Sequence, residues 1–169
     1  MQGIRLENWK VEVAIPNLLI KATLQPRGDL MIFLNNLTYT SFTFNDVELV
    51  PLGTDYQVKG VKQPMMNVTR NAISFMSVLE PEKATQIQLL QSKRLMVFYT
   101  EWFAVRGDLH VNTETPDENL LDDKFEFFML TDVTIYPLRA MNARPIAKAP
   151  AVAFNRHTIL AYHTQSPQP

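Results

Sequence analysis

The residues best suited to chemistry in this chain are three histidines, because imidazole binds metals and transfers protons near neutral pH. His157 and His163 lie six residues apart, and no carboxylate accompanies them at the spacing of metal ligands. Cysteine is absent, which excludes disulfides, thiol catalysis and thiolate metal sites. We therefore expect these two and His110 to be surface or hydrogen-bonded histidines, with no metal and no cofactor.

The motifs of common enzyme classes are also missing. The sequence has no Gly-x-Ser-x-Gly nucleophile motif, no phosphate-binding loop and no Rossmann glycine pattern. Its five glycines leave few positions for a loop of backbone amides around a phosphate. No set of residues in the sequence supports a hydrolase or another enzyme, and we predict a non-catalytic protein.

Basic side chains cluster in two segments, although the net charge of −1 is spread evenly along the chain. From 139 to 156 four basic residues occur without an acidic one, beside the aromatic Tyr136 and Phe154. Such a segment suits single-stranded RNA, or it docks the acidic segment 114–126 of a neighbouring subunit; solvated loop charge is the third alternative. The candidate partner or RNA contacts in the basic loops 59–70 and 139–157 are Lys59, Lys62, Arg70, Arg139, Arg144, Lys148, Arg156 and His157.

The segments that must position these residues occur twice in the sequence, as an internal repeat. A shift of 86 positions aligns residues 34–81 with 120–167 without a gap and yields eleven identities in 48 positions. Chance predicts about three at ordinary residue frequencies. The identical residues of the first copy are Leu34, Phe42, Asp46, Val47, Pro51, Leu52, Lys62, Pro64, Arg70, Ile73 and Pro81. Such a repeat indicates two equivalent units, which we expect to pack on each other or on a partner because small units bury little surface alone.

Alternation of apolar and polar residues with a period of two predicts β-strands in both copies. In the first copy, residues 11–15 and 18–24 form a predicted hairpin around Pro16-Asn17. A short helical turn and then the strongest strand follow in each copy, at 30–35 and 42–52 and again at 116–121 and 128–138.

Two recurring features mark where these strands bend. Ala22 and Gly107 are small residues inside predicted strands, which lets the sheet bend or another backbone approach. Asp46 and Asp132 occupy equivalent positions in the strongest strands. We favour a structural role at a strand kink, where the carboxylate binds nearby backbone amides, over a hydrogen bond to a ligand. Pairing of each aspartate with the repeated arginine of its own copy is a further hypothesis.

Two motifs of each copy are similar to those of known families. The second copy contains Phe127-Phe-Met-Leu-Thr-Asp132-Val and Ala153-Phe-Asn155-Arg156-His-Thr-Ile159, and the first keeps Phe44-Asn-Asp46-Val and Val68-Thr-Arg70-Asn-Ala-Ile73. These pieces resemble the Sm-like small barrels and a bacterial family of unknown function. The resemblance implies small β-barrels that form rings through strand-edge pairing, with RNA binding in many Sm-like proteins.

We therefore predict a mainly β protein with two tandem repeats of a small, strongly bent five-stranded Sm-like barrel, each with one short helical turn. The first barrel is expected at residues 1–81 and the second at 94–163. Residues 82–93 form the linker, which suits a short helix, and 164–169 form a disordered tail.

The predicted function is that of an interaction or assembly module. Small open barrels leave unpaired edge strands, which invite pairing with another chain. We expect a protein partner or self-association in a larger or homo-oligomeric complex, with RNA binding as the alternative. The candidate interface anchors are Trp9, Trp102 and Tyr99, because aromatic side chains dominate interface energetics. The absence of a long apolar stretch and of a signal-peptide core predicts no membrane span and a cytoplasmic location.

Overall fold

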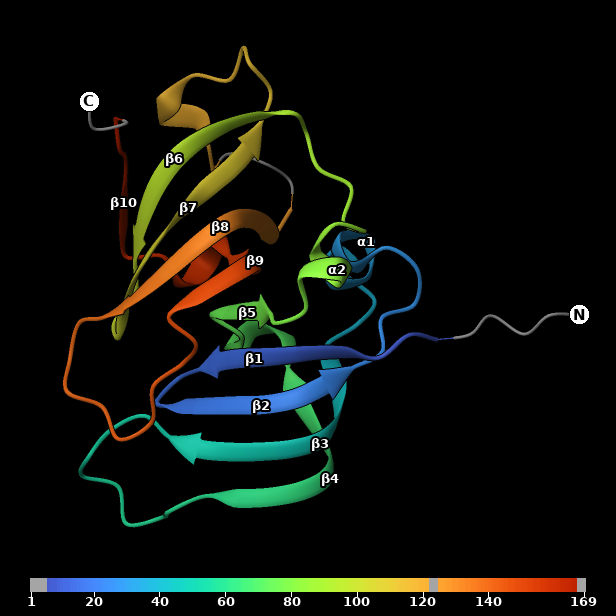
Figure 1. The fold of residues 1–169 in the computed structure, drawn as a ribbon, viewed down its shortest axis with the longest axis vertical. Coiled ribbons are helices and arrows are strands. Elements are labelled where there is room, and N and C mark those ends of the chain that lie inside the picture. The colour runs from blue at the N-terminus through green and yellow to red at the C-terminus, as the bar shows by residue number, and fades with distance from the viewer. Residues whose placement is uncertain (1–5, 122–124, 167–169) are drawn as a thin grey trace, which may run out of the picture.

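The computed structural model describes residues 6–121 and 125–166, which form an antiparallel β-protein with few helices (Figure 1). Within these residues the strands are β1 (Trp9–Ile15), β2 (Leu18–Leu24), β3 (Ser41–Pro51), β4 (Val61–Thr69), β5 (Phe75–Val78), β6 (Ser92–Tyr99), β7 (Phe103–Val111), β8 (Phe127–Pro137), β9 (Lys148–Asn155) and β10 (Ala161–Thr164). The helices are α1 (Leu30–Asn35) and α2 (Pro81–Ala84), with 3₁₀ turns at Arg70–Ala72, Asp117–Asn119 and Arg156–Thr158. The prediction of a mainly β protein is confirmed.

All the strands of the described residues belong to one open sheet, in the order β10-β6-β7-β8-β9-β5-β1-β2-β3-β4. The N-terminal half contributes β5-β1-β2-β3-β4, and the C-terminal half contributes β10-β6-β7-β8-β9 in the same relative order. The halves join where β5 pairs with β9, from Phe75 opposite Phe154 to Val78 opposite Ala151. Because the sheet stays open at β4 and β10, the finer prediction of two tandem Sm-like barrels is not confirmed.

Two pairs of equivalent residues bend the strands. Ala22 and Gly107 lie at β-bulges, where the register of β2 against β3 and of β7 against β8 shifts. A Cβ on Gly107 would lie 3.0 Å from a methyl group of Val133, so the close approach of β7 and β8 leaves little room for a side chain there. Asp46 and Asp132 both have a φ of 51°, in the left-handed region that aspartate tolerates. The predicted kinks are therefore present, but within the described residues no hydrogen bond to either carboxylate is recorded.

The helical turn before β3 is held by its own cap. The Asp29 side chain accepts hydrogen bonds from the backbone N–H groups of Met31 (2.9 Å) and Ile32 (3.1 Å) at the start of α1. Leu30 and Leu34 lie on the buried face of this turn. The predicted turn at 30–35 is confirmed, and in the other half a 3₁₀ turn occupies Asp117–Asn119 within the predicted range.

The boundaries between the predicted parts differ in detail from the expectation. The linker begins with α2 but reaches β6 already at Ser92. Thr164 belongs to β10 and the N–H of Gln165 donates to the carbonyl of Leu95 at 2.8 Å, so the expected tail is ordered at least to that point; residues 167–169 lie outside the described residues. No helix among the described residues combines the length and the apolar character needed to cross a membrane.

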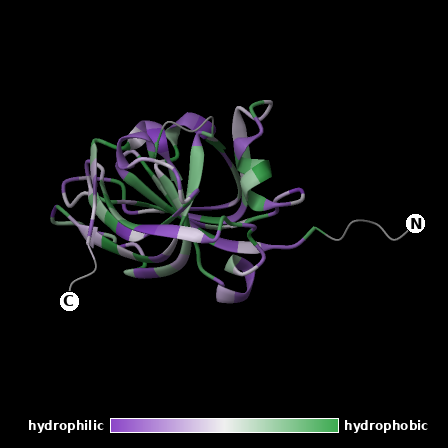
Figure 2. Cartoon of the chain, turned by 90° about the horizontal axis from the view of Figure 1, so that it is seen from above, coloured by the Kyte–Doolittle hydropathy of each residue, from purple (hydrophilic) through white to green (hydrophobic). Residues whose placement is uncertain are grey.

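Two hydrophobic cores fill the molecule, and each contains side chains from both halves. Figure 2 shows hydrophobic segments, in green, along several of the strands. The first core is mainly N-terminal but includes Phe127, Met129, Ala151 and Ala153. The second is mainly C-terminal but includes Ala14, Leu19, Leu52 and Phe75. Successive residues of a strand point to opposite faces of a sheet. In β9, Ala151 and Ala153 therefore join the first core, while Val152 and Phe154 join the second.

The aromatic centre of the second core leads to a stability prediction. The ring of Phe154 is fully buried and lies 5.5 Å from the ring centroid of Phe75 and 5.6 Å from that of Phe98. Phe154→Ala should lower the free energy of unfolding by about 3–5 kcal/mol, because it removes buried apolar contacts and leaves a cavity. Urea denaturation measures the change. Leu160→Ala, at an exposed position, is the control and should change stability by less than about 0.5 kcal/mol; similar losses in both variants would contradict the buried position of Phe154.

Candidate functional site

Arg70 joins the two halves from a buried position. Its side chain donates a hydrogen bond from Nε to Glu126 Oε2 (2.7 Å) and one from Nη1 to the carbonyl of Asn36 (3.2 Å). The guanidinium also lies over the rings of Phe42 and Phe127, at 5.8 and 5.4 Å from their centroids. The hypothesis that Arg70 pairs with the aspartate of its own copy is wrong, because its acidic partner belongs to the other half.

Asn35 makes a second contact across the same seam. Its amide nitrogen donates to the carbonyl of Phe127 (3.0 Å), and its amide oxygen accepts from the N–H of Phe127 (2.9 Å). The last residue of α1 therefore binds the first residue of β8 as a neighbouring strand would. Glu126, the residue before β8, also lies 3.9 Å from Nε2 of His157. Arg156 donates from Nη1 to the carbonyl of Leu121 at 3.4 Å.

These contacts divide the predicted basic cluster in space. Lys148 begins β9 and Arg156 follows its end, so an eight-residue strand separates them by roughly 25 Å. Arg70, Arg156 and His157 lie at the seam beside Leu121 and Glu126. The predicted set is thus not one surface, because a strand that runs through the sheet carries the two ends of the segment apart.

The remaining basic residues of the set lie in or beside two loops at one end of the molecule (Figure 1). The loop after β3 meets the loop after β8, where the N–H of Asn142 donates to the carbonyl of Leu52 at 2.7 Å. The second loop is also tied to β1, because the N–H of Ile146 donates to the buried carboxylate of Glu12 at 2.7 Å. The exposed basic side chains here are Lys59, Lys62, Arg139, Arg144 and Lys148.

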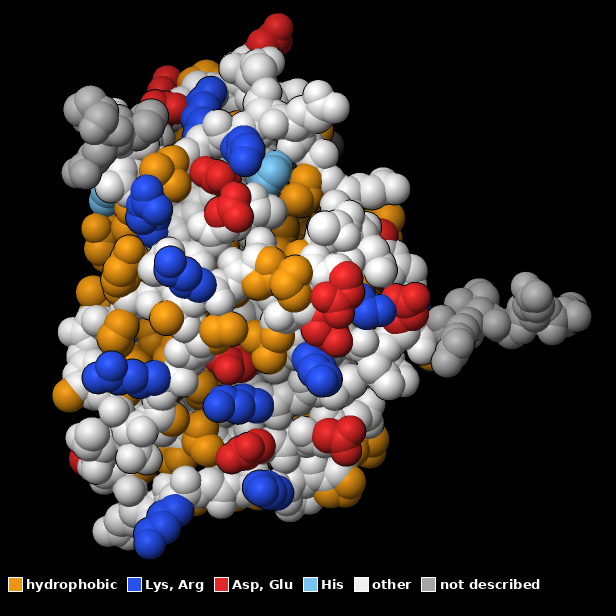
Figure 3. All heavy atoms as spheres, in the orientation of Figure 1, with side chains coloured by type: hydrophobic (Ala, Val, Ile, Leu, Met, Phe, Trp, Pro, Cys, Tyr) orange, Lys and Arg blue, Asp and Glu red, His pale blue; other side chains and the backbone are white. Residues whose placement is uncertain are grey.

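The aromatic side chains in or beside these loops differ in exposure, and Tyr56 in the loop after β3 is exposed. Tyr136 is exposed, but Phe154 lies in the core and has no free face for stacking. Arg139 packs over the ring of Trp102, at 4.3 Å from its centroid, and pairs with Glu101 at 3.2 Å. The face over β1 to β4 carries interspersed basic and acidic side chains rather than one sign of charge (Figure 3).

The predicted anchors occupy different environments. Trp9 and Trp102 are only 5% and 8% exposed, and the indole N–H of Trp102 donates to Asn17 Oδ1 at 3.2 Å. Tyr99 is half-buried, and its hydroxyl lies 3.1 Å from Nε2 of His163 across the β6–β10 pair. Both indoles thus serve internal packing in this structure, and the anchoring roles of all three side chains stay predictions.

The two edge strands are open to solvent, unlike their counterparts inside the sheet. All residues of β10 are exposed, whereas all residues of β5, at positions 86 lower, are buried. Most of β4 is exposed as well, whereas β9 is buried from Ala151 to Asn155. Each edge therefore offers a row of backbone groups that pairing with another strand would satisfy.

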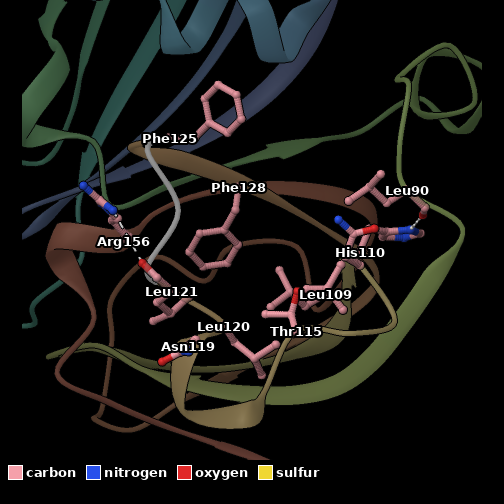
Figure 4. Close-up of a pocket in the computed structure, with 12 residues that line it drawn as sticks. Leu90, Leu109, His110, Thr115, Asn119, Leu120, Leu121, Phe125, Phe128 and Arg156 are labelled. Atoms are coloured by element: carbon pink, nitrogen blue, oxygen red, sulfur yellow. Dashed lines mark hydrogen bonds between the residues drawn. The ribbon is translucent and has the colours of Figure 1, made fainter.

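An apolar cleft lies between α1, the linker and the described residues between β7 and β8, which include Leu121 and Phe125 (Figure 4). It consists of two adjacent cavities of about 250 Å³ and about 220 Å³. The cavities share Leu90, His110, Phe125 and Phe128 as lining residues. Sequence reasoning missed this site, because its walls come from both halves and from the linker.

His110 holds the linker against the sheet at this cleft. Its Nδ1 lies 2.7 Å from the carbonyl of Leu90, and its Nε2 lies 2.7 Å from the hydroxyl of Thr131. A carbonyl only accepts, so Nδ1 carries a proton, and in the neutral ring Nε2 accepts from Thr131. His110 is thus a structural residue of the cleft wall. Within the described residues no group of three or more His, Asp or Glu side chains comes together to hold a metal.

The ion pair across the seam can be tested by a substitution that keeps its shape. Glu126→Gln leaves the buried guanidinium of Arg70 beside a neutral amide, which should destabilise the fold by about 2–3 kcal/mol. Glu101→Gln makes the same chemical change in the exposed pair with Arg139 and should cost less than about 1 kcal/mol. Chemical denaturation of both variants checks this, and equal effects would show that the seam pair contributes no more than a surface pair.

Comparison of this chain with protein-family models, with curated proteins and with solved structures gave no match. The function of the chain is therefore inferred from its own contacts, edges and charges.

Proposed function

We propose that this chain is a non-catalytic assembly module, built from two duplicated Sm-like units, that associates with further copies of itself through its two free sheet edges. The observation that carries the proposal is the β5–β9 pairing inside the chain. It joins the fifth strand of one half to the fourth strand of the other. The strands left without such a partner are β4 and β10, which are the fourth and fifth strands of their halves.

The duplication is supported by positions that recur at the same offset as the sequence repeat. β3 and β5 begin and end 86 residues before β8 and β10. The N–H of Arg70 donates to the carbonyl of Thr40, and that of Arg156 donates to the carbonyl of Glu126, both at 2.9 Å. The left-handed aspartates recur at this offset, and the two bulges recur 85 residues apart. These agreements support an equivalent backbone course in the two halves.

The internal pairing supplies a register for the contact between copies. Each residue of the β5–β9 pair has an equivalent 86 residues away in the other half, in β10 or β4. If β10 of one copy pairs with β4 of the next in the same register, Ala161 lies opposite Val68 and Thr164 lies opposite Met65. Pro64, which has no backbone N–H, directly precedes this stretch in β4. Because the two edges differ, the contact is head-to-tail and generates a ring where the rotation closes and a filament where it does not.

A cysteine pair tests both the association and its register. The chain has no cysteine, so Asn67→Cys with Tyr162→Cys introduces the only two thiols, at positions expected to face each other across the contact. The edges lie at opposite ends of the sheet, so the two thiols of one chain cannot meet. Mild oxidation should produce a ladder of disulfide-linked multimers on a non-reducing gel, because only facing strands bring two Cα atoms within about 7 Å.

The control pair is Gln63→Cys with Tyr162→Cys, which is out of register by four residues and should cross-link far less. Light scattering of the wild-type chain should give a mass above that of the monomer. A monomeric mass at high concentration, together with equal cross-linking of both cysteine pairs, would overturn the proposal.

RNA binding is the second candidate, favoured by one observation. The contact between Asn142 and Leu52 brings the basic loops of both halves to one end of the molecule. A single-stranded RNA along this end would meet the exposed side chains of Arg144 and Lys148, which carry no ion pair within the described residues.

Salt dependence tests this candidate. Affinity for a labelled single-stranded RNA, measured by anisotropy between about 50 mM and about 200 mM salt, should fall linearly on a double-logarithmic plot. Arg144→Gln with Lys148→Gln should reduce the slope by about 1.4, because each cation on a single strand accounts for about 0.7. Lys21→Gln, on β2, is the matched control and should leave the slope unchanged. Absence of binding at low salt would remove the candidate.

A further inference from the structure

The cleft beside α1 is bordered by large apolar side chains that are open to solvent. Ile32 is 72% exposed, Leu90 53% and Phe125 56%, and all three line the cavities. Figure 4 shows Phe128 and Leu120 on opposite sides of the first cavity. Apolar side chains gathered at a hollow and rimmed by polar residues mark an interaction site rather than ordinary surface.

One loop beside the first cavity is acidic. The loop that supplies Thr115, Asn119 and Leu120 to the first cavity contains no basic residue from 112 to 121. Three acidic side chains on this loop are exposed, namely Glu114, Asp117 and Glu118. Asp117 is paired with Arg94, whereas the described structure records no ion pair for the two glutamates. Arg156 also lines the first cavity, where it donates to the carbonyl of Leu121.

The size of the cavities indicates what fits. At about 250 Å³ and about 220 Å³, each lies below the usual range for pockets that enclose a drug-sized ligand, which starts at about 300 Å³. Each is large enough for one bulky apolar side chain. Because the cavities adjoin each other at Phe125 and Phe128, two such side chains of one peptide segment can enter them together.

We propose that this cleft docks a short basic segment of a partner protein. Two large apolar side chains of the segment occupy the cavities, and its lysine or arginine side chains face Glu114 and Glu118. Charge complementarity of this kind steers the encounter and selects against acidic segments. The site uses neither β4 nor β10, so it is independent of the assembly through the sheet edges.

Peptide binding tests the proposal on the full chain. The probe is a short labelled peptide with two leucines flanked by lysines, and its counterpart replaces every lysine by glutamate. Fluorescence anisotropy should show binding of the lysine peptide only. Phe125→Ser should weaken binding about tenfold, because it removes an exposed apolar wall of both cavities. Glu114→Gln with Glu118→Gln should weaken it about threefold and make it less sensitive to salt.

The control is Tyr136→Ser, which removes a similarly exposed aromatic side chain near the other end of β8. It should leave binding unchanged, and thermal unfolding should show that all variants remain folded, since every substituted side chain is exposed. Equal binding of the glutamate peptide, equal weakening by Tyr136→Ser, or no binding of the lysine peptide would each overturn the proposal. Binding of an uncharged apolar dye alone, displaced by neither peptide, would assign the cleft to small molecules instead and would also overturn it.

Discussion

The pairing of β5 with β9 is the constraint on which the rest of the structure depends. Both strands lie in the interior of the sheet, and every residue of β5 is buried. Since side chains alternate across a strand, each of these strands contributes to both hydrophobic cores. Without the other half, each half of the chain would expose the edge of β5 or of β9 and part of a hydrophobic core. The two halves therefore form one cooperative unit, although their strand orders are the same.

The same pairing explains why equivalent strands differ in sequence. β5 reads Phe-Met-Ser-Val and is buried, whereas β10 reads Ala-Tyr-His-Thr and is exposed. The last five residues of β9 read Ala-Val-Ala-Phe-Asn and are buried, whereas the equivalent residues of β4 read Met-Met-Asn-Val-Thr and are mostly exposed. An edge strand that meets water needs polar residues to limit indiscriminate pairing. Such an edge suits a selective contact between copies better than permanent burial in a hydrophobic core.

Sequence reasoning succeeded where the signal was local and failed where it depended on distant partners. The hairpin around Asn17, the helical turn at 30–35 and the kinks at Asp46 and Asp132 were predicted because their residue types limit the backbone in place. The basic residues predicted from the sequence do not form a single cluster in the structure, because β9 separates Lys148 from Arg156. Trp9 and Trp102 are aromatic side chains of the core, and nothing in their local pattern distinguishes a buried indole from an anchor on the surface.

The sequence by itself determined the kind of element at each position and the offset between equivalent elements, because alternation, turn residues and the repeat are properties of neighbouring residues or of the printed order. Only the tertiary structure decided which strand pairs with which, that Arg70 meets Glu126 rather than Asp46, and that the linker and α1 enclose a cleft with β7 and β8. These outcomes depend on contacts between residues far apart in the chain. Such contacts are selected by the burial of whole faces and by the pairing of buried charges, and neither is encoded in any single segment.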